Sequence, residues 1–161
     1  MTALTVQAQH TVGYLNPQEV LDQLPERDAI ERQLNNWLDE KEVEFEELAL
    51  DFQRQLRIFE QEADDLTDSQ LQSRQRELQR LNQQLEEFQF RVERDLERRQ
   101  AELLQPILQE IDLIVEEVAR EKGLTYVLNQ ATAEGELLLI HVAQSARDLD
   151  LTPIVIERLL N

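Results

Sequence analysis

Apolar residues recur at spacings of three, four and seven positions from Glu26 to Lys122, and this pattern constrains the fold more than any other feature. Such spacing is typical of helices that pack along a coiled-coil seam. No glycine or proline interrupts the stretch between Glu26 and Gln105. The pattern predicts two long helices, whose seam residues are Ile30, Leu34, Leu38, Phe45, Leu48, Phe52, Leu56, Phe59, Ala63 and Leu66 in the first and Leu71, Leu78, Leu81, Leu85, Phe88, Val92, Leu96, Leu103, Ile107, Ile114 and Val118 in the second.

A short polar segment divides the two helices. Thr67, followed three places later by Gln70, has the form of a capping box that opens a helix. We therefore place the tip of a hairpin near Leu66–Ser69. At about 1.5 Å per residue the two arms, residues 34–104, extend roughly 45–60 Å. A hairpin of this length has a single partner face, so we expect it to require an anchored base.

Three β-prone runs flank the hairpin, at residues 11–15, 124–129 and 137–142. Pro17 can open a short helix that continues to Leu24, and Pro25 can start the first long helix. A sheet of three short strands exposes two edges, and pairing with copies of the chain would remove them. We therefore expect a homo-oligomer whose contact residues are Val12, Tyr14, Tyr126, Val127, Leu128, Leu138 and Ile140.

Proline and glycine mark the remaining boundaries. Pro106 should kink the second helix where the arm meets the body, and Gly123 should end that helix. Thr152 is interpreted as an N-cap with Pro153 at the first position of a last helix, which ends at Leu160. The predicted fold class is α+β, mainly α, with a long antiparallel coiled-coil hairpin on a small body.

The predicted organisation has three parts. Residues 11–33 together with 105–161 form the oligomerisation body, and residues 34–104 form the hairpin arm. Residues 1–10 are either a disordered tail or the remnant of an export signal. Val6-Gln7-Ala8 resembles the small-residue pattern before a signal cleavage site, although no basic region precedes it.

The formal net charge of −18 argues against binding to nucleic acid or to anionic membranes. The charge is unevenly placed: residues 39–65 carry eleven acids and three bases, a net of −8, whereas residues 68–100 carry seven of each. An acidic helix beside an arginine-rich one supports antiparallel pairing through flanking charges. No run of eighteen apolar residues exists, so the sequence predicts no membrane-spanning segment.

Nothing in the sequence predicts catalysis, and we expect no enzyme activity, metal or cofactor. Cysteine is absent, and the two histidines, His10 and His141, lie far apart. His141, in an apolar run, is interpreted as a packed or interface residue. Asp148 and Asp150 lack the glycine and distal glutamate of a calcium loop, so they are interpreted as a polar turn.

Four apolar residues lie on helix faces that the hairpin partner should not cover. They are Val43, Leu50, Ile58 and Phe90. We interpret them as contacts for a client polypeptide, with the alternative that they are scattered surface residues of the ordinary kind.

Several segments resemble the family of periplasmic chaperones called Skp or OmpH-like. They are Val12-Gly13-Tyr14-Leu15-Asn16 with Val20-Leu21, Leu104-Gln105-Pro106-Ile107, Val118 to Leu124 running into Tyr126-Val127-Leu128-Asn129, and Asp150-Leu151-Thr152 with Val155, Arg158 and Leu159. The resemblance covers Val12 to Leu160, with the segments in the same order as in the family. The Gly-Tyr start and the Lys-Gly-Leu entry into a strand are its more specific parts.

The resemblance implies a homotrimer in the periplasm, in which strands of three chains form a small β-barrel body and three hairpins surround a cavity. It also implies a holdase that works without ATP and prevents the aggregation of unfolded outer-membrane proteins. Well-known members have basic arms, whereas the first arm here is acidic, which argues against binding to lipopolysaccharide or membranes. The rival hypothesis is a coiled-coil structural or adaptor protein that binds one folded partner.

Overall fold

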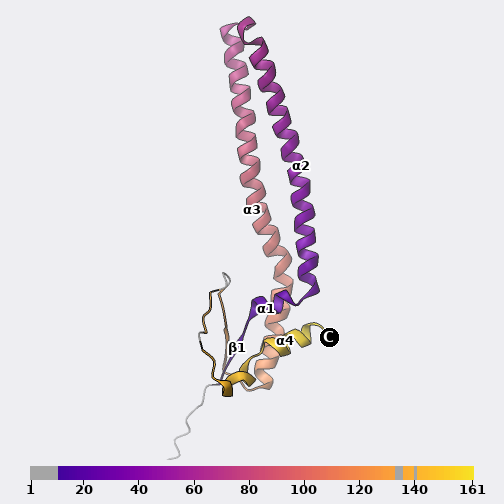
Figure 1. The fold of residues 1–161 in the computed structure, drawn as a ribbon, viewed down its shortest axis with the longest axis vertical. Coiled ribbons are helices and arrows are strands. Elements are labelled where there is room, and N and C mark those ends of the chain that lie inside the picture. The colour runs from indigo at the N-terminus through magenta and orange to yellow at the C-terminus, as the bar shows by residue number, and fades with distance from the viewer. Residues whose placement is uncertain (1–10, 133–135, 140) are drawn as a thin grey trace, which may run out of the picture. The chain divides into compact units, whose positions relative to one another are not determined.

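The computed structural model describes residues 11–132, 136–139 and 141–161, which are mainly helical with one small sheet, as the sequence predicts (Figure 1). The elements in order are β1 (Val12–Leu15), α1 (Pro17–Asp22), α2 (Pro25–Glu62), the 3-10 helix η1 (Ala63–Asp65), α3 (Asp68–Glu121), β2 (Tyr126–Asn129), the 3-10 helix η2 (Gln144–Leu149) and α4 (Thr152–Leu159). They divide into two compact units. The hairpin unit is Ile30–Glu102, and the base unit comprises residues 11–29 and 103–161.

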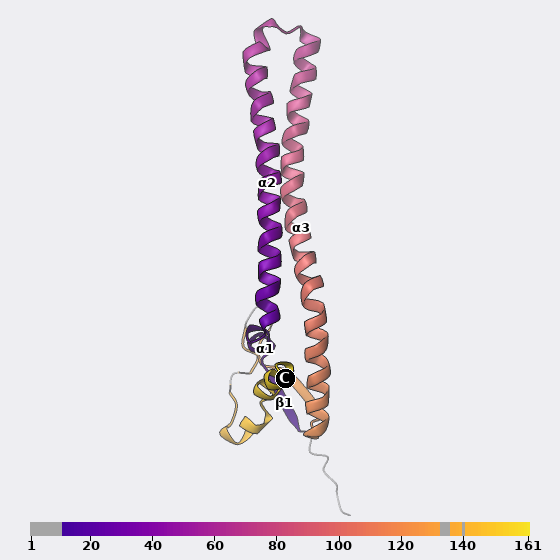
Figure 2. The same ribbon diagram turned by 90° about the vertical axis from the view of Figure 1, so that its right-hand side faces the viewer.

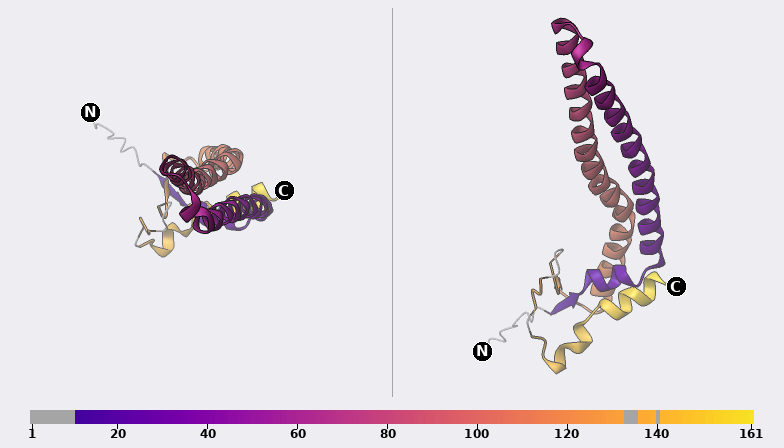
Figure 3. Two further views of the ribbon diagram at one scale, coloured as in Figure 1. Left: turned by 90° about the horizontal axis from the view of Figure 1, so that it is seen from above. Right: turned by 45° about the horizontal axis from the view of Figure 1, so that its top comes forward.

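Within the hairpin unit, α2 and α3 run side by side in opposite directions (Figures 2 and 3). Aromatic side chains join them: the ring centroids of Phe45 and Phe88 are 6.2 Å apart, and the guanidinium carbon of Arg99 lies 5.2 Å from the centre of the Trp37 ring. Both contacts pair a residue of α2 with a residue of α3. The two long helices of the predicted hairpin are therefore present and packed antiparallel, whereas the coiled-coil geometry stays a prediction.

The turn of the hairpin begins earlier than predicted. Helix α2 ends at Glu62, and Ala63 belongs to η1 and no longer to the seam of the helix. Thr67 precedes α3, and the Gln70 side-chain oxygen accepts hydrogen bonds from the Thr67 N–H at 3.0 Å and from its hydroxyl at 2.7 Å. Half of the predicted capping box is thus present. The hydroxyl differs from the prediction because it donates to Gln70 and does not cap a backbone N–H.

Burial in the hairpin is sparse, and no side chain within about twelve residues of the turn is buried. Its buried side chains are Ile30, Trp37, Leu81 and Phe88. Between residues 38 and 80 the apolar seam positions are only half-buried, and no side chain there is buried. A pair of helices has one shared face, so water reaches both margins of the seam.

The sheet of the base unit pairs β1 with β2 in parallel, with Val12 opposite Tyr126 and Tyr14 opposite Leu128. Parallel strands need a long crossover, and here the connection contains α1, α2 and α3. Gly13 is required by a close approach, since a Cβ there would lie 2.6 Å from Leu124 Cδ1 and 3.3 Å from the Leu149 carbonyl oxygen.

The core of the base unit combines residues of α1, α3 and the start of α4. Val20 of α1, Val118 of α3, Val155 of α4 and Leu151, which immediately precedes α4, are fully enclosed. Helix α3 ends as predicted in front of Gly123, whose φ is 63°. The Gly123 N–H donates to the Arg120 carbonyl, and the Leu124 N–H donates to the Ala119 carbonyl, which completes a Schellman motif.

Two expectations for the base unit change. Residues 137–142 form no strand in the described part of the chain, where only an isolated antiparallel bridge joins Leu137 to Ala131. Pro106 lies inside α3, as expected, and the kink there stays a prediction. Thr152 is the first residue of α4 and not its N-cap: its hydroxyl accepts a hydrogen bond from the backbone N–H of Asn16 at 3.0 Å.

Candidate binding surfaces

Three of the four predicted client contacts are exposed on the hairpin unit. Val43 and Leu50 on α2 are 56% and 58% exposed, and Phe90 on α3 is 67% exposed. The fourth, Ile58, is only half-buried and so offers less surface. The helix geometry explains the exposure, because Val43 and Leu50 are seven residues apart and share a face that points away from the seam.

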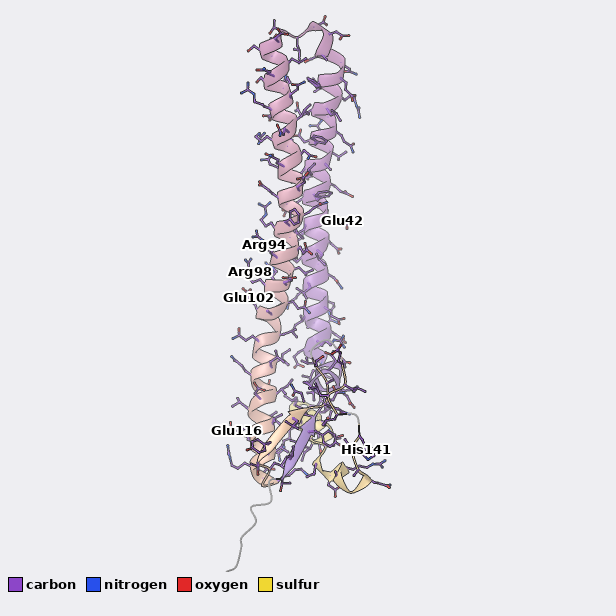
Figure 4. The ribbon with its side chains drawn as sticks, turned by 90° about the vertical axis from the view of Figure 1, so that its left-hand side faces the viewer. Glu42, Arg94, Arg98, Glu102, Glu116 and His141 are labelled. Carbon is purple, nitrogen blue, oxygen red and sulfur yellow. The ribbon has the colours of Figure 1, made fainter. Side chains whose placement is uncertain are left out.

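Charged side chains surround these apolar residues. A shallow groove on α3 is lined by Phe90 with Glu87, Arg91, Glu93, Arg94 and Glu97. In Figure 4, Arg94, Arg98 and Glu102 lie on the side of α3 away from α2, and Glu42 lies on the side of α2 away from α3. The outer faces of the hairpin therefore present isolated apolar side chains in a charged setting.

The ion pairs within the hairpin stabilise single helices. Lys41 pairs with Glu44, Arg54 with Asp51 at 3.5 Å, Arg80 with Glu77 at 2.6 Å, and Arg98 with Asp95 at 2.9 Å. Each joins residues three apart on one helix. The hydrogen bond from Arg80 lowers the pKa of Glu77. At these positions the charges therefore pair within one helix and not, as predicted, between the two helices. Between the helices, the Arg99 guanidinium lies over the ring of Trp37.

One face of the sheet in the base unit is apolar and partly open. The register places Val12, Tyr14, Tyr126 and Leu128 on this face, where Val12 is 37%, Tyr126 57% and Leu128 47% exposed. Tyr14 is half-buried, and burial raises the pKa of its hydroxyl, with Asp150 raising it further and Arg147 opposing both. Four of the predicted oligomerisation residues therefore lie together.

The other predicted oligomerisation residues lie apart from this face. Val127 is half-buried and, with Leu15, points to the opposite side of the sheet. Leu138 is 57% exposed in the segment that follows β2, and Ile140 lies outside the described residues. A cavity of about 180 Å³ beside the open face is lined by Val12, Gly13, Tyr14, Leu128, Leu139, His141, Val142, Ala143, Ala146 and Leu149.

Two exposed leucines on α3 of the base unit were not predicted. Leu108 is 42% exposed, and Leu113 is 62% exposed in a shallow groove with Gln109, Asp112 and Glu116. Both lie off the face of α3 that carries the buried residues Ile107, Ile111 and Val118. That placement is the signal by which the sequence could have identified them.

The described residues hold no arrangement typical of a metal or a membrane span. No three acidic or histidine side chains among them converge to hold an ion. Among the described helices none is both long enough and apolar enough to cross a bilayer. His141 is exposed (Figure 4) and lines the base cavity, so it is not packed within the single chain, and its interpretation as an interface residue stays a prediction.

The fold defines a class of protein: a chain with a long two-helix hairpin unit and a small α+β base unit. A family described as outer membrane protein (OmpH-like) matches residues 11–159. The chain belongs to this OmpH-like family, as the resemblance in the sequence indicates.

A solved structure gives the same fold. It is an OmpH-like protein from Caulobacter crescentus CB15, provisionally described as an outer membrane chaperone, with a TM-score of 0.70 and 13% sequence identity over 99% of this chain and 89% of that chain. No curated protein matches the sequence. At this identity the similarity establishes a shared fold.

Proposed function

We propose that the protein is an ATP-independent holdase chaperone of the periplasm, which binds unfolded outer-membrane proteins and prevents their aggregation. Membership of the OmpH-like family supports a chaperone role. The observation that carries the proposal is the exposure of Val43, Leu50 and Phe90 on the outer faces of the hairpin. Their spacing suits an extended, unfolded chain better than a compact partner.

Each contact that these exposed side chains can make with a client is weak. Covering a leucine that is more than half exposed gains about 1 kcal/mol. Several such contacts distributed along a hairpin hold a polypeptide and release it without a nucleotide, because each contact breaks on its own. This balance is what a holdase requires, and it needs neither a catalytic group nor a cofactor.

Assembly would multiply the contacts. We propose that the protein is a homotrimer joined through its base units, with the hairpins around a shared cavity. The open sheet face of Val12, Tyr14, Tyr126 and Leu128 supports this arrangement, since aromatic and aliphatic side chains half-open to water favour burial against another copy. Three copies of 19.0 kDa have a mass of 57 kDa.

The direct test is suppression of the aggregation of an unfolded outer-membrane β-barrel protein, without nucleotide, at a stoichiometric ratio. Serine at Val43, Leu50 and Phe90 should weaken suppression, and serine at the half-buried Ile58 should have a smaller effect. Serine at Leu108 and Leu113, which are exposed on the base unit, is the matched control. Equal activity of both sets of variants would refute these four residues as the client contacts.

Light scattering tests the assembly. A mass near 57 kDa supports the trimer. A single protomer at all working concentrations would remove the shared cavity and, with it, the mechanism. Saturable binding to one folded protein, with no effect on unfolded clients, would instead support a coiled-coil adaptor.

A further inference from the structure

Val43 has four neighbours on the surface of α2, and all four are acidic. Positions three and four residues before and after it are Asp39, Glu40, Glu46 and Glu47, and these are the positions that adjoin a helical residue. All four carboxylates are exposed. The 56% exposed side chain of Val43 thus lies at the centre of four negative charges.

These carboxylates are free of ion pairs in the part of the chain that the structure describes. Elsewhere on the hairpin Glu44, Asp51, Glu77 and Asp95 each pair with a basic residue three positions away. The four acids around Val43 have no base at the corresponding positions that reaches them. Their uncompensated negative charge therefore attracts an approaching positive charge.

Phe90 on the other arm shows the same arrangement. Its four surface neighbours are Glu86, Glu87, Glu93 and Arg94, three carboxylates and one guanidinium with a net charge of −2. This excess occurs although residues 68–100 are neutral in total, with seven acids and seven arginines. Within residues 68–100, negative charge is therefore in local excess around the exposed aromatic ring, as it is around Val43 on the other arm.

We infer that the hairpin selects unfolded segments in which apolar residues alternate with lysine or arginine. Such a segment places an apolar side chain on Val43 or Phe90 and basic groups on the surrounding carboxylates. The alkyl stems of lysine and arginine also cover apolar surface while their charged ends reach out. An acidic segment would be repelled at the same positions. This inference deepens the proposed chaperone function and rests on it.

The test uses three short unstructured peptides with the same leucine, valine and phenylalanine residues, separated by lysine, glutamine or glutamate. Binding to the full chain is measured by fluorescence anisotropy at low salt and near 1 M salt. We expect the lysine peptide to bind about tenfold more tightly than the glutamine peptide, the sum of several exposed ion pairs. The advantage should vanish near 1 M salt, where screening acts within roughly 3 Å. Equal affinities for the three peptides would overturn the inference.

Two matched variants locate the effect. The first carries Asp39→Asn, Glu40→Gln, Glu46→Gln and Glu47→Gln, and should lose most of the preference for the lysine peptide. The second carries Glu60→Gln, Glu62→Gln, Asp64→Asn and Asp65→Asn, which neutralises four exposed acids near the hairpin turn. It should keep the preference, and an equal loss in both variants would overturn the assignment to the surroundings of Val43.

The outcome is separable from that of the proposed function. If the chain suppresses aggregation of an unfolded outer-membrane protein and binds the three peptides equally, the inference fails and the holdase function stands. If neither suppression nor peptide binding occurs, the proposed function fails as well. Circular dichroism of both variants confirms that the helices form.

Discussion

Replacing two phenylalanines of α3, Phe88 and Phe90, should have very different effects on the stability of the fold. Phe88 is 5% exposed and lies against Phe45, whereas Phe90, two residues later, is 67% exposed. Replacing a buried phenylalanine by alanine costs about 3–5 kcal/mol. The seam of the hairpin is open to water at its margins, so we expect the lower end, about 3 kcal/mol. Replacing Phe90 should change the free energy of unfolding by less than about 0.5 kcal/mol.

The comparison cancels the intrinsic preference of the helix for alanine. That preference is worth about 0.5 kcal/mol at either position, so the difference between Phe88→Ala and Phe90→Ala isolates burial. Trp37 is the only tryptophan in the sequence and lies in the hairpin unit, so its fluorescence during a urea titration reports on the hairpin itself. With a slope of about 2 kcal/mol per M, the two midpoints should differ by about 1.5 M.

Equal shifts of the two midpoints would refute this reasoning, because they would show that Phe88 is not enclosed by the seam. In the aggregation assay we expect the opposite order of effects for the two variants. Phe90→Ala should weaken the suppression of client aggregation while leaving the midpoint unchanged. A loss of suppression that follows stability in both variants would remove Phe90 from the client surface.

Three further predictions concern the base unit. Gly123→Ala should lower the free energy of unfolding by about 1 kcal/mol, because the φ of 63° is unfavourable for a residue with a Cβ, while Gly123→Asn should cost less in the same thermal melt. Gly13→Ala should cost about 1–3 kcal/mol through overpacking against Leu124 and the Leu149 carbonyl, and a melting temperature equal to that of the unchanged chain would show that the close approach is relieved. The hydrogen bonds from Arg158 lower the pKa of Glu121. This pair therefore stabilises the fold above the ordinary pKa of glutamate, and the stabilisation disappears as the pH falls through the lowered pKa. The melting temperatures of the unchanged chain and of Glu121→Gln should converge on acidification, and a constant difference would contradict a stabilising Arg158–Glu121 pair.

The helices could be predicted from sequence because their signals are local. Proline at positions 17 and 25, the capping residue Thr67 and Gly123 each act within one turn of the chain. The start of α2 at Pro25 and the end of α3 at Glu121 follow directly from them. The turn of the hairpin was misplaced by a few residues, because Ala63 continues the apolar spacing although it belongs to η1.

The contacts of the base unit depend on residues that are distant in sequence. The Thr152 hydroxyl meets the requirements of a helix cap, but in the fold it accepts a hydrogen bond from the backbone N–H of Asn16 instead. Residues 137–142 are apolar enough for a strand, yet an apolar run becomes a strand only beside a partner strand. The sequence of one chain does not say where that partner lies.

The predicted binding residues divide in the same way. Helical periodicity alone placed Val43, Leu50 and Phe90 away from the seam, and they are exposed. Ile58 has the same periodicity but lies in the open end of the hairpin, where the two helices enclose less, so seam and outer face differ little there. Leu108 and Leu113 were not predicted, because they lie on the part of α3 in the base unit and not on the hairpin arms.

The absence of any buried side chain between residues 53 and 80, the part of the hairpin around the turn, has a consequence for motion. Separating two surfaces that water already touches sacrifices little hydrophobic free energy, so this part of the hairpin opens and closes more readily than the part that holds Trp37 and the Phe45–Phe88 contact. Its backbone amides should exchange with solvent first. Phe59 on its seam can then leave the facing helix and contact the side chains of a guest polypeptide.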